Sequence, residues 1–119
     1  KIVVCDRYID SSVAYQGYGR GLGKEFIDDI NSFAIKNRMP DITLFFDITP
    51  ERAFERKGGA DKNDRMEQSG LSFHKKVYEG YLRQAEEYPE RIVRINAEQT
   101  VENVFADVIR VLRERNIVK

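Results

Sequence analysis

The chain is poor in the residues that build several kinds of functional site. It has no tryptophan, one cysteine and one histidine. A single cysteine, Cys5, excludes an internal disulfide framework, and its bland interpretation is a small buried hydrophobe. The lone His74 has no second histidine or cysteine as a metal partner. Nor does the sequence join Cys5 and His74 into the nucleophile and base of a hydrolase.

Net charge and long apolar runs are absent as well. Twenty basic and twenty acidic side chains give a formal net charge of +0, so charge offers no argument for nucleic acid or an anionic membrane. The apolar runs are far too short to span a bilayer, and no signal peptide is visible. We therefore expect a cytoplasmic protein. The 119 residues predict one domain, or part of one, and an opening on Lys1 rather than Met suggests a piece of something longer.

Apolar periodicity predicts strands that alternate with helices. The evidence is apolar runs of strand length, one-sided apolar stripes, and threonine caps before two of the helices. We expect strands at 2–5, 42–47 and 91–95, and helices at 24–37, 50–56, 69–87 and from Thr100 onward. Residues 57–64, with two adjacent glycines, are expected to form a mobile loop. This order favours a parallel sheet with right-handed crossovers.

The segment from residue 6 to residue 21 carries the most chemistry. If residues 2–5 form a strand, Asp6 and Arg7 stand at its carboxyl end, where open α/β sheets bind ligands. Arg7 offers a planar fork suited to a phosphate, and Asp6 can hold Mg²⁺ directly or through water. Beyond them, Tyr15 supplies a flat face and Gln16 an amide able to read the edge of a base.

This segment resembles the signature of bacterial thymidylate kinases, D-R-Y-x-x-S-x-x-A-Y-Q-G-x-x-R-G. Residues 40–51 are similar to a second landmark of that family, P-D-L-T-L-Y-L-D-V-x-P-E. Residues 64–67, followed by Phe73, are similar to the exit of its lid loop, here about 57–67. Residues 94–97 resemble the strand and turn before the final helix. The resemblance covers essentially the whole chain.

The resemblance implies a fold and a reaction. The fold is a P-loop NTPase-type three-layer α/β/α sandwich with a parallel sheet. The reaction transfers the γ-phosphoryl group of ATP to dTMP with Mg²⁺, and it serves dTTP biosynthesis. The family position of Asp6 organises Mg²⁺, through water, and the attacking phosphate oxygen. Family members are usually homodimers, and the apolar helix at 24–37 is a candidate contributor.

The resemblance also assigns the acceptor side of the site. Arg7 matches the position that binds the dTMP phosphate. Ser12 and Gln16 match residues that hydrogen-bond thymine, and Tyr15 matches one that packs near the deoxyribose. Arg20 matches an arginine that contacts substrate or braces the loop. The alternatives are a structural ion pair for Asp6 and Arg7, and ordinary helix surface and core for the others.

The donor side carries cations on and around the lid. By resemblance, Arg65 reaches the transferring phosphoryl group, Arg56 covers adenine, and Ala97 lies beside adenine. Lys57 and Lys62 are further lid candidates, with plain solubility as the competing interpretation. Since many relatives carry arginines where this lid has lysines, the choice of clamping cation stays open.

One family element has no match among these residues. No G-x-x-x-x-G-K-[ST] loop is present, and the glycines of residues 17–23 lack the lysine and hydroxyl. In the family that loop lies upstream, on a strand between those that match 2–5 and 42–47. We therefore expect the C-terminal portion of an enzyme, inactive by itself, with exposed strand edges.

Two other functions compete with this interpretation. One is another nucleoside monophosphate kinase, for example for deoxynucleosides or UMP, against which the Ala-Tyr-Gln-Gly run around Gln16 argues. The other is a non-catalytic nucleotide-binding or dimerising module descended from such a kinase. The missing P-loop favours the module, whereas the retained Asp6, Arg7 and Arg65 oppose it.

Overall fold

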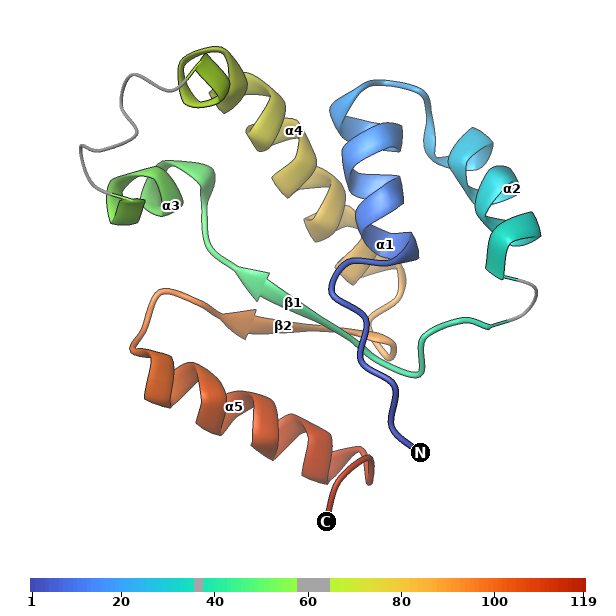
Figure 1. The fold of residues 1–119 in the computed structure, drawn as a ribbon, viewed down its shortest axis with the longest axis vertical. Helices are drawn as coiled ribbons and strands as arrows, with labels where there is room; N and C mark the ends of the chain where they lie inside the picture. The colour runs from blue at the N-terminus through green and yellow to red at the C-terminus, as the bar shows by residue number, and fades with distance from the viewer. Residues whose placement is uncertain (36–37, 58–64) are drawn as a thin grey trace.

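The computed structural model describes residues 1–35, 38–57 and 65–119. Its elements, in chain order, are α1 (Ile9–Ser12), the π-helix η1 (Val13–Gly19), α2 (Lys24–Ile35), β1 (Thr43–Asp47), α3 (Pro50–Lys57), α4 (Arg65–Glu87), β2 (Ile92–Asn96) and α5 (Val101–Glu114). Figure 1 shows the two strands in the middle, with α5 on one side and the other helices on the opposite side.

The described sheet is a parallel pair of strands. Thr43 stands opposite Ile92, and the register continues to Asp47 opposite Asn96. The chain between the strands contains α3 and α4, so this is a β–α–β unit. The predicted parallel sheet is confirmed for these two strands, and each was located to within one residue.

Two threonines begin helices as predicted. The Thr49 hydroxyl accepts a hydrogen bond from the Arg52 amide at 3.3 Å, ahead of α3. The Thr100 hydroxyl accepts one from the Asn103 amide at 3.1 Å, ahead of α5. Each hydroxyl satisfies an amide that the helix itself leaves without a partner. The helix predicted at 69–87 begins earlier, at Arg65.

The prediction of a buried strand at residues 2–5 is wrong. Ile2, Val3 and Val4 are 61%, 82% and 87% exposed, and Cys5 is exposed as well. A strand exists only through hydrogen bonds to a neighbour. Within the described ranges β1 and β2 pair with each other, and residues 2–5 lie outside that sheet. An apolar run therefore did not suffice to make a strand.

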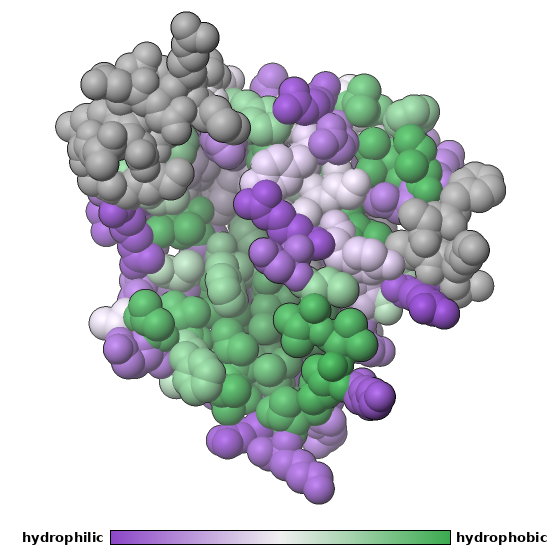
Figure 2. All heavy atoms as spheres, in the orientation of Figure 1, coloured by the Kyte–Doolittle hydropathy of each residue, from purple (hydrophilic) through white to green (hydrophobic). Residues whose placement is uncertain are grey.

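The sheet is covered unevenly, whereas the sequence predicted a second strand covered on both faces. Phe45 is buried against α4, in a cluster with Ala85 and Ile92. Its neighbour Phe46 points to the opposite face and is 53% exposed. That face is covered only in part by α5, which packs on β2. Figure 2 shows apolar side chains gathered in this lower part of the molecule.

Candidate functional site

Three of the predicted acceptor residues, Ser12, Tyr15 and Gln16, lie on one continuous helical segment, with Arg7 just before it and Arg20 just after it. Its first turn, α1, runs directly into η1, where the Arg20 amide donates to the Tyr15 carbonyl at 3.0 Å, five residues back. Such π-helical turns are rare and occur frequently at functional sites. Val13 and Ala14 are buried, Tyr15 is half-buried and Gln16 is exposed. The side chain of Gln16 is therefore accessible to solvent.

Two glycines let this segment approach α4 closely. A Cβ atom on Gly19 would stand 2.7 Å from Cε2 of Phe73 and 2.8 Å from Cγ2 of Val77. A Cβ atom on Gly80 would stand 2.9 Å from the side chain of Tyr18. Contacts that short are not tolerated, so both positions require glycine as the helices stand.

Cations and aromatic rings alternate along the contact between η1 and α4. The Arg7 Cζ atom lies 5.3 Å from the ring centroid of Tyr15. The Tyr15 and Phe73 rings are 6.0 Å apart, and Arg20 Cζ lies 5.1 Å from the Phe73 centroid. These distances suit cation–π and aromatic contacts. The structure therefore brings together Arg7, Tyr15 and Arg20; their binding of dTMP stays a prediction.

Tyr81 contacts Tyr15, one of these aromatic residues, and also Phe45 in β1. Its hydroxyl donates to Ser11 Oγ at 2.6 Å, and its ring stacks on Phe45 at 5.0 Å between centroids. The same ring meets the edge of Tyr15 at 6.4 Å. Burial raises the pKa of the Tyr81 hydroxyl. The sequence did hold a signal for Ser11, because the signature D-R-Y-x-x-S counted from Asp6 places its serine there, although only Ser12 was predicted to contact the base.

The segment is tied to the sheet at the amino ends of the strands. Asp10 accepts hydrogen bonds from Thr43, the first residue of β1, and from Arg91, which directly precedes β2. Asp6 and Arg7 were predicted to follow a strand at the carboxyl edge, and that prediction is wrong. The physical reason is that residues 2–5 join no sheet, so the segment is located by the polar contact of Asp10 instead.

A second cluster occupies the carboxyl ends of the strands. Asp47 accepts from the Tyr78 hydroxyl at 2.6 Å and from Nε of Arg94 at 2.8 Å. Burial, followed by the hydrogen bond to Asp47, raises the pKa of Tyr78 to about 12. The hydrogen bond to Asp47 likewise raises the pKa of Arg94. These three groups fix one another at the edge where a ligand of an α/β protein is expected.

Comparison with known proteins assigns the family. Residues 1–108 match the family model described as thymidylate kinase. The chain belongs to the thymidylate kinase family. It is 48% identical over 116 residues to the thymidylate kinase of Halalkalibacterium halodurans, covering 96% of this chain and 55% of that protein. With the thymidylate kinase of Clostridium novyi it shares 51% identity over 110 residues, covering 91% and 54%.

A solved structure supports the same fold. The crystal structure of thymidylate kinase from Ehrlichia chaffeensis superposes with a TM-score of 0.67 at 34% identity, covering 95% of this chain and 51% of that one. The α/β fold predicted from the sequence is thereby confirmed. The chain spans about half the length of the curated relatives it matches.

Two residues predicted to lie on the ATP side of the site, Arg56 and Ala97, are brought to the same turn. Arg56, near the end of α3, donates to the Gln99 carbonyl at 3.3 Å, which brings it to the turn that contains Ala97. The Ala97 amide donates to the Asp47 carbonyl at 3.0 Å. Lys62, the remaining loop candidate, lies outside the described residues, as do the side chains of Lys57 and Arg65.

The described residues can be compared with the ligands that Mg²⁺ takes in proteins. Among residues 1–35, 38–57 and 65–119, no group of three or more His, Cys, Asp or Glu side chains is arranged to hold a metal. Mg²⁺ is commonly held by one or two carboxylates together with water and substrate phosphates. A single exposed carboxylate, Asp6, fits that mode when nucleotide and water supply the other ligands.

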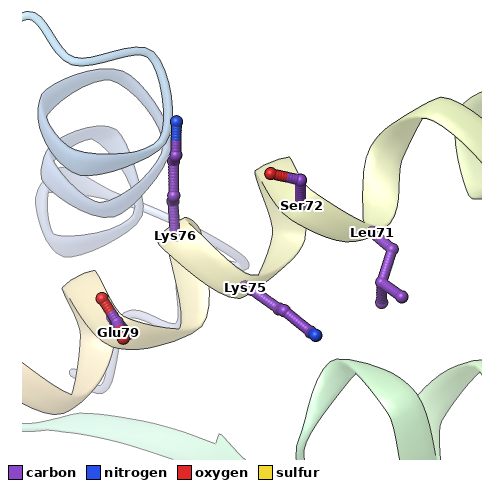
Figure 3. A pocket seen from close by; sticks show the side chains of 5 residues that line it. All are labelled: Leu71, Ser72, Lys75, Lys76 and Glu79. Carbon is purple, nitrogen blue, oxygen red and sulfur yellow. The ribbon is translucent and has the colours of Figure 1, made fainter.

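Two other features lie outside the site. The ring of His74 meets the rings of Phe54 and Phe73 at 5.7 and 5.5 Å. In Figure 3 the labelled side chains of α4 point in different directions. An open hollow of about 390 Å³ lies along this helix. It is lined by Leu71, Ser72, Lys75, Lys76 and Glu79. None of the helices in the described part of the chain is long and apolar enough to cross a membrane.

Proposed function

We propose that the protein to which these residues belong transfers the γ-phosphoryl group of ATP to dTMP. The observation that carries the proposal is the guanidinium group of Arg7 over the ring of Tyr15, which is followed in the same helical segment by the exposed Gln16. A nucleoside monophosphate bound here would place its phosphate at Arg7 and its base at Gln16.

The acceptor residues have distinct tasks in this proposal. Arg7 binds the dTMP phosphate through its planar fork. Tyr15, held by Phe73 and Tyr81, offers a surface for the deoxyribose, and Ser12 and Gln16 bond the thymine edge. An acceptor phosphate oxygen is already anionic, so the reaction requires alignment and charge neutralisation more than a strong base.

The donor side is completed by groups from other elements. Arg56 covers adenine next to Ala97, and Arg65 reaches the transferring phosphoryl group. Asp6 holds Mg²⁺ through water, and the bound ion supplies charge neutralisation at the phosphates. We further propose that the donor phosphates are cradled by a P-loop segment outside these 119 residues.

The proposal also includes a homodimer and a cytoplasmic location. Phe26 and Ile30 on α2 are 55% and 50% exposed, and an apolar helix surface of this kind suits the contact of a homodimer. ATP-dependent phosphorylation of a nucleotide implies the cytoplasm.

The decisive experiment compares two proteins. One is the 119-residue chain; the other, here called the completed protein, is the same chain fused to the N-terminal P-loop segment of a thymidylate kinase relative. Each is assayed for conversion of labelled dTMP to dTDP with ATP and Mg²⁺. We expect no turnover by the chain alone and turnover by the completed protein.

Other results would redirect the assignment. Robust turnover by the chain alone would require another phosphate cradle, with residues 17–23 the first place to search. A completed protein that phosphorylates UMP in preference to dTMP would favour the broader monophosphate kinase. A completed protein that folds, binds nucleotide and phosphorylates none would favour the non-catalytic module.

A further inference from the structure

We propose that Asp10 is a positioning residue that sets the location of Arg7 in the acceptor site. Asp10 does not contact substrate in this proposal; it acts by holding α1 on the sheet. The inference rests on the proposed function, because Arg7 is the residue assigned to the dTMP phosphate.

The surroundings of Asp10 are those of a built polar anchor. The residue is 5% exposed. Its Oδ2 atom accepts from Thr43 Oγ1 at 2.7 Å and from a terminal nitrogen of Arg91 at 2.6 Å. Its backbone carbonyl accepts from Nε2 of Gln84, a residue 1% exposed, at 3.0 Å. Asp10 therefore links α1 to both strand starts and to α4.

Holding a helix with a buried carboxylate has a cost in desolvation free energy. Its desolvation is offset only if its partners are well placed, and an apolar residue of similar size often serves stability as well. Val13, Ala14 and Gly17 lie on the same helical stripe, at i+3, i+4 and i+7 from Asp10, and all are buried. The carboxylate adds directional contacts to that apolar stripe. Its hydrogen bonds to Thr43 and Arg91 fix the position of the helix along the strands.

The position of Arg7 depends on the placement of α1, because the residues that precede α1 are exposed. Residues 1–8 are all exposed. Arg7 itself has φ 64, a left-handed backbone that a residue with a side chain adopts only when its surroundings impose it. Its guanidinium group contacts the ring of Tyr15, and its backbone is placed by Asp10, three residues later, which is bonded to the sheet. Loss of the Asp10 anchor would let the guanidinium group leave the position where a phosphate is bound.

The test uses the completed protein and four variants. Asp10→Asn keeps the shape and one oxygen acceptor but removes the negative charge that pairs with Arg91, and Arg91→Met removes the opposite partner. The double variant closes the cycle. Val111→Ala in α5 is the matched control, because Val111 is 5% exposed and lies in another part of the core. For each protein we would measure the melting temperature and KM for dTMP and for ATP.

A positioning role predicts a split between the two substrates. Loss of the charge-assisted contact in Asp10→Asn should raise KM for dTMP about tenfold and leave KM for ATP within about twofold. The double variant should recover part of the loss, since neither partner is then left buried alone. Val111→Ala should lower the melting temperature without changing either KM.

Two results would overturn the inference. In one, Asp10→Asn melts earlier but keeps its KM for dTMP, which makes the contact purely structural. In the other, Val111→Ala raises KM for dTMP as much as Asp10→Asn does, which makes the effect a general one. If the unsubstituted completed protein itself fails to phosphorylate dTMP, the proposed function fails first and this inference falls with it.

Discussion

The guanidinium group of Arg7 lies over the ring of Tyr15, with 5.3 Å between Cζ and the ring centroid. A cation held by its face leaves the nitrogen atoms at its edge available for hydrogen bonds. In an exposed setting the contact contributes about 0.5–1 kcal/mol, enough to bias a side chain toward one location. This geometry supports the proposal that the edge of Arg7 binds a phosphate while Tyr15 supports its face.

The first prediction concerns Arg7. Arg7→Ala in the completed protein should remove a charge-assisted interaction of about 1.5–3 kcal/mol. We expect kcat/KM for dTMP to fall about ten- to a hundredfold, with a much smaller change for ATP. Steady-state kinetics would measure both. Arg110→Ala, at an exposed α5 position, is the control, and unchanged dTMP kinetics in Arg7→Ala would refute the assignment.

The second prediction concerns base recognition. Gln16→Leu removes the exposed amide that offers both a donor and an acceptor to thymine. A polar group of the base is then left without a partner, and dTMP binding should weaken by about 1–3 kcal/mol. Isothermal titration of the completed protein measures this directly, with ATP affinity as the internal control. Equal dTMP affinity in the two proteins would return Gln16 to a surface role.

The third prediction concerns the close approach of η1 and α4. Gly19→Ala introduces a Cβ atom 2.7 Å from Phe73 and 2.8 Å from Val77, so the helices must separate. We expect the free energy of unfolding to fall by about 1–3 kcal/mol, as overpacking generally causes. Gly17→Ala is the matched control in the same helix, since its Cβ atom would meet neighbours at ordinary distances from 3.5 Å. Urea denaturation of both variants should separate them, and equal stabilities would contradict the packing described here.

The fourth prediction concerns alkaline pH. The pKa of Tyr78 is raised to about 12 in the fold, so the neutral hydroxyl is favoured there. The unfolded chain loses this proton near pH 10, at a lower pH than the folded chain. Above that pH the folded state binds more protons, and stability falls as pH rises toward about 12.

The variant Tyr78→Phe isolates that contribution. Its free energy of unfolding should fall less between pH 9.5 and 11.5, by urea denaturation, than that of the unsubstituted completed protein (a pH range of about two units around the shift). All other tyrosines and lysines are common to both proteins. Parallel pH profiles would show that the Tyr78 hydroxyl is not perturbed by the fold.

Local signals in the sequence predicted the elements that depend on local chemistry. Thr49 and Thr100 cap helices by bonding amides three residues away, and both were located from sequence. β1 and β2 were found because short segments rich in apolar residues, five or six residues long and bounded by turn or polar residues, have the length of a strand rather than of a helix. Residues 2–5 carry the same signal and form no strand, because pairing depends on a neighbour that a local pattern cannot supply.

The sequence predicted the motif residues of the candidate site but not the residues that hold them in place. Arg7, Tyr15 and Arg20 were recognised and lie together. Asp10 was passed over, although an acid within a stripe of Val13, Ala14 and Gly17 is a visible anomaly. Its partners Thr43 and Arg91 are 33 and 81 positions away, so no spacing rule connects them.

The long reach of the Asp10 contact has a consequence during protein synthesis. Asp10 leaves the ribosome well before Arg91, which follows 81 positions later. At about 5–20 residues per second, several seconds pass before that partner exists. Throughout that interval the first helical segment carries an acid on its apolar side and cannot dock in its final place. Folding of the acceptor segment is therefore set by the arrival of the later half of the chain, and the nascent helix is exposed to misassociation until then.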